Sequence, residues 1–215
     1  MAKKNVEVLE SIYSENDRIA DGIFKKLSEN NVYTVNIMGA PGIGKTSSLI
    51  QIIKELEGVK TYVIEGDIES DIDTAKLKSL GITSVQINTG GACHLDANVI
   101  DNTIKKLEPL QKGMLFIENI GNLVCPAEFN IGENIKMLIS SVTEGADKPY
   151  KYPLAFEKAG IILLNKIDLL PYVDFDVEYY KRGIRALNKE VPIFEVSCKT
   201  GEGFNEVCSW LKKRI

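Results

Sequence analysis

The 215-residue sequence contains no run of 18 or more apolar residues, a single histidine and only four cysteines. Without a long apolar run, no membrane-spanning segment and no membrane partner are expected. Residues 1–7 lack the apolar core of a secretion signal, so we expect a cytoplasmic protein. In that compartment four cysteines do not suggest a disulfide scaffold, and we expect thiols that are buried or available to a metal.

The sequence also lacks an excess of positive charge. Lysine and arginine number 26 against 30 aspartates and glutamates, which gives a net charge of −4. Domains that bind nucleic acid through bulk charge are usually basic, so we expect no nucleic-acid partner. Hydrophobic residues make up 44% of the chain and charged residues 26%, and these proportions are ordinary for a globular protein that buries a core.

The first 31 residues are predicted to be an N-terminal segment built on one amphipathic helix. Between residues 6 and 27, apolar side chains recur every three or four positions, with charged residues between them. We expect this helix to pack on the domain that follows, residues 32–215. A docking arm for a partner or a second subunit is the alternative.

From residue 33 onward, short apolar runs alternate with amphipathic stretches. The runs cover residues 33–38, 61–64, 85–87, 114–117, 137–142, 161–164 and 193–196. The helical candidates cover residues 45–56, 73–80, 96–107, 176–188 and 204–213. This alternation predicts an α/β fold, a mainly parallel sheet of about seven strands with helices on both faces. Residues 121–133 are the least regular stretch, and we expect a functional loop there.

Residues 39–46, GAPGIGKT, match the pattern G-x-x-x-x-G-K-S/T. They follow an apolar run and open a helix, which is the setting of the phosphate-binding loop in P-loop NTPases. Glycines let successive backbone N–H groups face phosphate oxygens, and the helix start adds its positive dipole end. Lys45 is expected to reach the β- and γ-phosphates and the Thr46 hydroxyl to bind Mg²⁺. The candidate nucleotide-binding residues here are Gly39, Gly42, Ile43, Gly44, Lys45, Thr46 and Ser47.

A second motif, N-K-x-D, follows the apolar run that ends at residue 164. The Asp168 carboxylate can accept hydrogen bonds from the ring N1–H and the exocyclic amine of guanine. Adenine offers no such pair of donors, so this residue favours GTP and GDP over adenine nucleotides. A helix N-cap or turn role for Asp168 is the alternative. The candidate base-binding residues are Asn165, Lys166, Asp168, Ser197, Cys198 and Lys199.

The only histidine, His94, directly follows Cys93, and a further cysteine, Cys125, precedes a proline. Thiolate and imidazole are ligands for Ni²⁺ and Zn²⁺. Adjacent residues point apart on a strand or helix, so Cys93 and His94 can chelate one ion only from a turn, which Gly90 and Gly91 allow. The alternative is that both thiols are small buried hydrophobes and that His94 is a capping or surface residue.

The strings GAPGIGKT, NTGGACHLDA, FIENIGNLVCPAEF, NKIDL and SCKTGEGF occur in this order. Together they resemble the HypB family, GTPases that help insert nickel into nickel-iron hydrogenase, over nearly all of residues 33–211. The strings CHLDA and ENIGNLVCP together are what distinguish this family, because the GTPase motifs alone fit a wider class of metallochaperone GTPases. Many relatives carry an N-terminal cysteine motif or a histidine-rich stretch, and this chain has neither. Ile43 stands where small residues are common, and we expect its side chain to alter the loop's outer wall.

The resemblance implies GTP/GDP, Mg²⁺ and Ni²⁺ or Zn²⁺ as cofactors, and a homodimer that forms when GTP binds. Cys93, His94 and Cys125 would hold the metal at the subunit contact. By motif match, Asp67 and Asp73 occupy the switch region, and Asp73 and Glu118 hold or orient Mg²⁺. Together with Lys45, these three are the candidate catalytic residues. Turn-capping and helix-capping roles are the alternatives for the two aspartates.

The expected function is that of a GTP-hydrolysing metallochaperone that assists nickel insertion into hydrogenase. Its partners would be hydrogenase maturation proteins, such as a nickel-delivering accessory protein. Turnover is expected to be slow because no arginine lies near the motifs. Glu118 lies seven residues before Cys125, so one segment could couple the nucleotide to the metal. The alternatives are a urease-type nickel GTPase, whose Cys-Pro-His motif is missing here, a metal-independent GTPase switch, and a small-molecule kinase.

Overall fold

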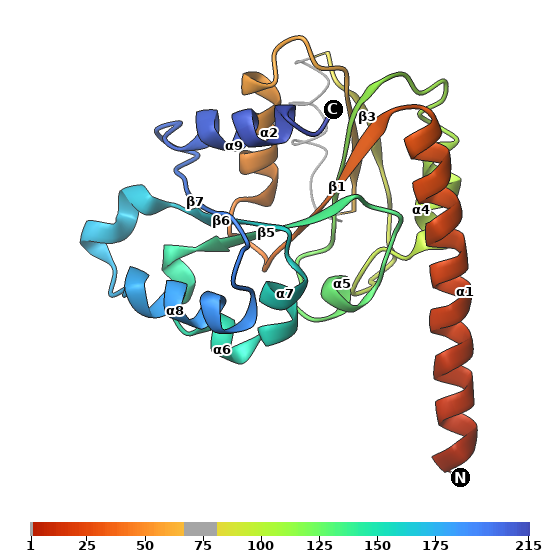
Figure 1. Cartoon of the computed structure of the whole chain (residues 1–215), viewed down its shortest axis with the longest axis horizontal. Coiled ribbons are helices and arrows are strands. Elements are labelled where there is room, and N and C mark those ends of the chain that lie inside the picture. The colour runs from red at the N-terminus through yellow and green to blue at the C-terminus, as the bar shows by residue number, and fades with distance from the viewer. Residues whose placement is uncertain (1, 67–80) are drawn as a thin grey trace.

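The computed structural model describes the backbone of residues 2–66 and 81–215, with side chains from residue 14 onward (Figure 1). The seven predicted strands are confirmed, and they form one parallel sheet in the order β3-β2-β4-β1-β5-β6-β7. The strands are β1 (Val32–Met38), β2 (Thr61–Glu65), β3 (Thr83–Gln86), β4 (Gly113–Glu118), β5 (Ile135–Ser141), β6 (Ile161–Asn165) and β7 (Ile193–Glu195).

The strand order reverses beside β1, in the middle of the sheet. The chain leaves β1 for β2 and β3, returns through β4, and then crosses to the other side of β1 at β5. Val35 of β1 accordingly lies between Phe116 of β4 and Ile135 of β5. Ligands of open parallel sheets bind at the carboxyl ends of the strands near such a reversal. The candidate nucleotide residues that follow β1, β4 and β6 all lie on this edge.

The helices are α1 (Ala2–Glu29), α2 (Lys45–Glu55), α4 (Ala97–Ile104), α5 (Cys125–Glu128), α6 (Lys148–Lys151), α7 (Pro153–Lys158), α8 (Val177–Leu187) and α9 (Phe204–Lys212), with 3-10 turns η1 (Val142–Glu144) and η2 (Ile167–Tyr172). The predictions for α2, α4, α8 and α9 are confirmed, with ends that differ by up to three residues. The candidate over 73–80 lies outside the described residues. Short helices α5 to α7 were not predicted, because one or two turns give no apolar periodicity.

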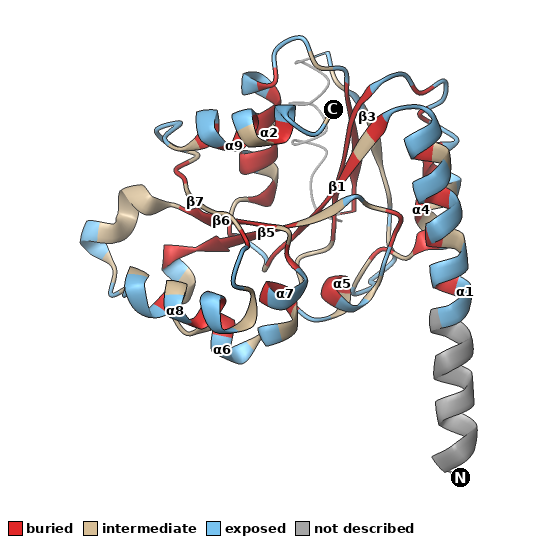
Figure 2. Cartoon of the chain, viewed as in Figure 1, coloured by how far each residue is buried: buried red, intermediate tan, exposed pale blue. Residues whose placement is uncertain are grey.

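Helices cover both faces of the sheet; the central strands between them are largely buried, while the edge strands β3 and β7 are only partly buried (Figures 1 and 2). On one face α2 and α9 bury Leu49 and Phe204 against the β1 side chains Val35 and Ile37. On the other face α1 and α4 cover the part around β2 and β4, while α7 and α8 cover β5 and β6. The continuous apolar runs in the sequence follow from this two-sided burial.

The second half of α1 packs along α4, and its first turns extend beyond the rest of the molecule (Figure 1). Ala20, Ile23 and Leu27 are buried in the cluster that also contains the apolar side chains of α4. Asn16 adds a polar link, because its side chain donates to the Asn130 carbonyl at 2.8 Å and accepts from the backbone N–H at the start of α4. In the part of the chain that the structure describes, no helix combines the length and apolar character needed to cross a bilayer.

Candidate nucleotide and metal sites

The phosphate loop begins where β1 ends and runs directly into α2. All three of its glycines have positive φ angles, 153° at Gly39, 74° at Gly42 and 95° at Gly44, a conformation that glycine adopts without strain. A Cβ atom on Gly44 would also lie 2.6 Å from Nδ2 of Asn165. Glycine is therefore required at position 44 both by the backbone conformation and by the close approach of the base-binding segment.

The expectation that the Ile43 side chain alters the outer wall of this loop is wrong. Its side chain is 1% exposed and packs in the core with Val35 and Leu49. A Cβ atom on Gly39 would clash with the Cδ1 atom of Ile43. The side chain therefore fills space beneath the loop, where a large apolar group stabilises the turn rather than reshaping its outer surface.

Three polar side chains meet at the start of α2. Lys45 is 4% exposed, and its Nζ donates to the Ala40 carbonyl at 3.2 Å. The Thr46 hydroxyl donates to Oε1 of Glu118 at 2.8 Å, although 72 residues separate the two in sequence. Glu118 ends β4 and is buried. A hydroxyl and a carboxylate are hard oxygen donors of the kind Mg²⁺ prefers, so this pair fits a magnesium ion. Ser47 is exposed on the same turn.

The N-K-x-D segment is bound to the phosphate loop by hydrogen bonds. Asn165, at the end of β6, donates through Nδ2 to the Ile43 carbonyl at 2.8 Å. Lys166 has a positive φ angle of 64°, and its Nζ donates to the Gly42 carbonyl at 2.8 Å. Both contacts join segments more than 120 residues apart. The base-binding and phosphate-binding segments therefore form one preassembled unit.

Asp168 lies within η2, where Lys166 occupies the N-cap position. Its Oδ1 accepts a hydrogen bond from the Ser197 hydroxyl at 2.6 Å, and Ser197 is fully buried. This bond fixes the orientation of the carboxylate. A fixed carboxylate at the carboxyl edge of the sheet suits recognition of a base with two adjacent N–H donors.

The loop after β7, residues 197–199, lies against the N-K-x-D segment. The backbone N–H of Cys198 donates to Oδ1 of Asn165 at 3.3 Å, and its thiol lies 3.2 Å from the Ser48 hydroxyl. Burial raises the pKa of the Cys198 thiol, so it is a neutral group at physiological pH. Lys199 is exposed. We call residues 39–47, 165–168 and 197–199 together with Glu118 the nucleotide cradle.

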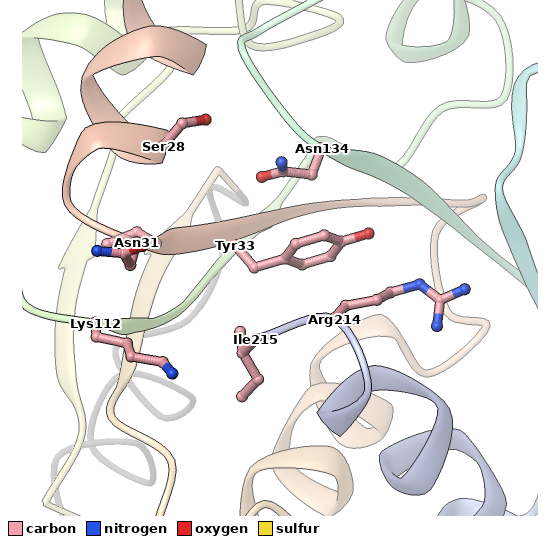
Figure 3. A pocket seen from close by; sticks show the side chains of 8 residues that line it. Ser28, Asn31, Tyr33, Lys112, Asn134, Arg214 and Ile215 are labelled. Carbon is pink, nitrogen blue, oxygen red and sulfur yellow. The ribbon is translucent and has the colours of Figure 1, made fainter.

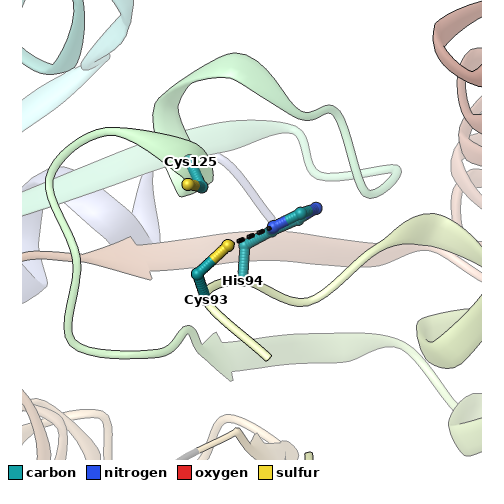
Figure 4. A group of neighbouring side chains, drawn as sticks. All are labelled: Cys93, His94 and Cys125. Atoms are coloured by element: carbon teal, nitrogen blue, oxygen red, sulfur yellow. Dashed lines mark hydrogen bonds between the residues drawn. The ribbon is translucent and has the colours of Figure 1, made fainter. Parts of the chain in front are cut away.

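Cys93 and His94, on the loop before α4, come together with Cys125, the first residue of α5, beside the cradle (Figure 4). Their ligand atoms all lie within 4.8 Å of one another, and the Cys93 Sγ is 3.3 Å from Nδ1 of His94. The turn before them contains Gly90 and Gly91, with φ angles of 58° and 93°, which lets two adjacent side chains face the same point. Cys93 is exposed, and the other two are partly buried. We call these three residues the metal triad.

The surroundings shift the pKa values of two triad members. Burial lowers the pKa of His94, although Asp96 and Glu128 oppose this shift by favouring the imidazolium. Burial raises the pKa of the Cys125 thiol, and the neighbouring Cys93 raises it further, while a hydrogen bond from Asn122 opposes the rise. A neutral imidazole is the form that binds a metal, so the pocket favours the ligand form of His94.

The metal triad rests on a layer of aromatic and charged groups. The ring of Phe129 stacks on His94 with centroids 4.0 Å apart. Lys136 of β5 donates to the Phe129 and Pro126 carbonyls at 2.6 and 3.2 Å and pairs with Glu133 at 2.5 Å. Because both partners of this ion pair are largely buried, the lysine holds α5, and with it Cys125, to the sheet.

Residues 119–124, here called the connecting segment, join Glu118 to Cys125, and sequence reasoning gave no role to their side chains. Asn119 is 1% exposed; its Oδ1 accepts from the backbone N–H groups of Leu95 and Ile120. Its Nδ2 donates to Oδ1 of Asn36 at 3.2 Å. The one available signal was Asn36 itself, a polar residue inside the apolar run 33–38.

Asp67 and Asp73 lie outside the described residues, so their assignment to the switch region stays a prediction. The structure also has a hollow of about 210 Å³ at the opposite edge of the sheet (Figure 3). It surrounds the start of β1, and its charged residues, Lys112 and Arg214, are exposed. The hollow is therefore remote from the nucleotide cradle and belongs to neither candidate site.

Comparison with known proteins agrees with this geometry. The family model of the CobW/HypB/UreG nucleotide-binding domain matches residues 33–195, which makes the chain a nucleotide-binding protein of this class. Hydrogenase maturation factor HypB of Azotobacter vinelandii is 43% identical over 210 residues, covering 97% of this chain and 69% of that protein.

Two solved structures are similar over almost their whole lengths. HypB from Archaeoglobus fulgidus superposes with a TM-score of 0.88 at 39% identity, covering 93% of this chain and 98% of that one. HypB from Helicobacter pylori in complex with nickel superposes with a TM-score of 0.87 at 33% identity, covering 93% and 94%. The chain belongs to the HypB family.

Proposed function

We propose that this chain is a GTP-hydrolysing metallochaperone that carries nickel for insertion into nickel-iron hydrogenase. The observation that carries the proposal is the metal triad, three soft or borderline ligands within 4.8 Å of one another beside a preassembled nucleotide cradle. Such ligands suit both Ni²⁺ and Zn²⁺. The nickel complex of the similar Helicobacter pylori protein supports nickel as the cargo.

Hydrolysis in this proposal depends on position and charge more than on covalent chemistry. Thr46 and Glu118 are the residues that would hold Mg²⁺, which would neutralise charge on the phosphates. Lys45 lies at the helix start with its ammonium group directed into the phosphate loop, where it can stabilise charge on the transferring phosphoryl group. The described part of the cradle contains no arginine, which is consistent with slow turnover.

The metal triad offers three ligands from one chain, which leaves a coordination position for another group. Val124, next to Cys125, is 47% exposed although it is apolar. We propose that a second copy of the chain covers this face when GTP is bound, and that an accessory maturation protein exchanges nickel there. In this role the chain acts in the cytoplasm, with residues 1–31 as a helix docked on a GTPase domain formed by residues 32–215.

Hydrolysis and nickel binding together test the proposal. GTP and ATP hydrolysis are measured on the wild-type protein and on Cys93→Ala/Cys125→Ala, and Ni²⁺ is titrated into each protein by calorimetry. We expect GTP to be hydrolysed in preference to ATP by both proteins, and nickel to bind the wild type alone. Light scattering should show a dimer with a non-hydrolysable GTP analogue and a monomer with GDP.

The rival functions predict different results. A metal-independent switch would bind no nickel, and the double variant would dimerise and bind partners as the wild type does. A small-molecule kinase would prefer ATP. Either result would overturn the metallochaperone assignment.

A further inference from the structure

Asn122 lies where the connecting segment meets the phosphate loop. Its main chain forms an antiparallel bridge with Gly39, the first residue of that loop. The segment touches the loop at a second point, because a Cβ atom on Gly121 would lie 2.9 Å from Cγ and 3.1 Å from N of Pro41. The loop and the segment are therefore in direct contact over at least two residues, with no space for an intervening layer.

The side chain of Asn122 points away from the phosphate loop, toward the metal triad. Its Nδ2 donates to the Cys93 carbonyl at 3.1 Å, across 29 residues of sequence. Its Oδ1 accepts from the backbone N–H of Val124 at 2.9 Å, one residue before Cys125. One amide group thus contacts the two loops that carry the two thiols.

His94 is anchored differently. The next residue, Leu95, is held through its backbone N–H by the buried Asn119, which in turn is bound to Asn36 of β1. This anchor lies in the sheet. Cys93 and Val124 are bound to Asn122, which lies against the phosphate loop, while Lys136 binds α5 to the sheet. A displacement of Asn122 where it meets the phosphate loop would therefore shift Cys93 and Val124 relative to Leu95, which changes the coordination geometry.

We propose that Asn122 is the positioning residue that couples the nucleotide state of the phosphate loop to the affinity of the metal triad for nickel. The proposal rests on the proposed function and adds the route by which nucleotide and metal communicate. Its chemistry is that of one amide group that donates to the Cys93 carbonyl, accepts from the Val124 N–H and is hydrogen-bonded to the Cys125 thiol. Allosteric couplings of this kind typically change affinity by about 5- to 150-fold.

The test measures the nickel affinity of each protein with GDP and with a non-hydrolysable GTP analogue. The quantity compared between proteins is the ratio of these two affinities. Asn122→Ala removes all of the side-chain bonds of Asn122. Asn122→Ser keeps an oxygen acceptor for the Val124 N–H and replaces the amide donor to the Cys93 carbonyl with the hydroxyl of a shorter side chain. Asn102→Ala, an exposed asparagine on α4 that donates to the Asn98 carbonyl, is the matched control. The absorption of the nickel–thiolate complex reports whether the ligands stay the same.

We expect the nickel affinities in the two nucleotide states to differ by at least fivefold in the wild type and in Asn102→Ala. In both Asn122 variants the two affinities should be nearly equal. The nickel–thiolate absorption should be unchanged in all four proteins, which separates positioning from loss of the site. A ratio in Asn122→Ser equal to that of the wild type would overturn the role of Asn122 while leaving nickel binding intact. Failure of the wild type to bind nickel would instead overturn the proposed function.

Discussion

The nucleotide cradle and the metal triad lie side by side but are built in different ways. Key side chains of the cradle are buried, with Asn165 1%, Lys45 4% and Ser197 0% exposed, and its parts are joined by hydrogen bonds across more than 120 residues of sequence. The triad is partly exposed, with two members on a loop and one at the start of the four-residue helix α5. The fold fixes the cradle in advance, whereas small movements of the segments that carry the triad can change its geometry.

The largest effect is expected from the charged layer beneath the triad. Lys136→Met leaves the buried Glu133 carboxylate without its cation, and breaking a buried pair in this way costs about 3–5 kcal/mol. Urea unfolding measures the loss. Lys105→Met removes a lysine from the more exposed pair with Asp101 and should cost less than about 1 kcal/mol. Equal losses in the two variants would show that the triad is not held by this ion pair.

The next effect concerns the cradle alone. Lys45→Ala removes a buried cation aimed at the phosphate loop, and we expect GTP hydrolysis to fall about 10²- to 10³-fold. Nickel affinity without nucleotide should be unchanged, because Lys45 does not contact the triad. Lys54→Ala, an exposed lysine at the end of the same helix, is the control for hydrolysis. A variant that hydrolyses GTP normally would exclude Lys45 from the reaction.

A smaller effect is expected at the base-binding end of the cradle. Asp168→Asn replaces an acceptor for two guanine N–H groups with one acceptor and one donor. The preference for GDP over ADP in competition binding should fall by about 1–3 kcal/mol, or about 5- to 150-fold. Asp174→Asn, an exposed aspartate in the same loop region, should leave the preference intact. Unchanged discrimination in Asp168→Asn would assign the choice of base to another residue.

The smallest effect is expected in the stability of the metal-free triad. Because Cys93 is exposed and Cys125 only partly buried, Cys93→Ser/Cys125→Ser should change the free energy of unfolding by no more than about 0.5 kcal/mol. Cys208→Ala, at a thiol that is 3% exposed, should cost about 1 kcal/mol or more. A large loss in the double variant would mean that the triad thiols support the fold. That result would contradict the contrast between a cradle fixed by the fold and a triad that is not.

Much of the fold was predictable because its signals are local. Each apolar run such as 161–164 indicates a strand by itself, and residues 39–46 carry both the glycines and the lysine of the phosphate loop. The helix α5 and the contacts of Lys136 were not predictable, because a single turn has no periodicity and the lysine's partners depend on the fold. Ile43 was misjudged for the same reason, since only the packed structure shows that its side chain turns inward.

For the sites, sequence reasoning selected the three triad residues but not what positions them. Nothing in the local sequence shows that Asn122 meets Gly39 or that Asn119 holds Leu95, because these contacts join segments brought together by the sheet. Residue types therefore indicate which chemistry is possible, while the arrangement of polar groups between them depends on tertiary structure.

The most direct test of the central claim is the nickel dissociation constant of the wild-type protein, measured by titration with GDP and again with a non-hydrolysable GTP analogue. If the triad responds to the cradle, the two constants differ by at least about fivefold. Equal constants in the two states would contradict the account, because the cradle and the triad would then act independently.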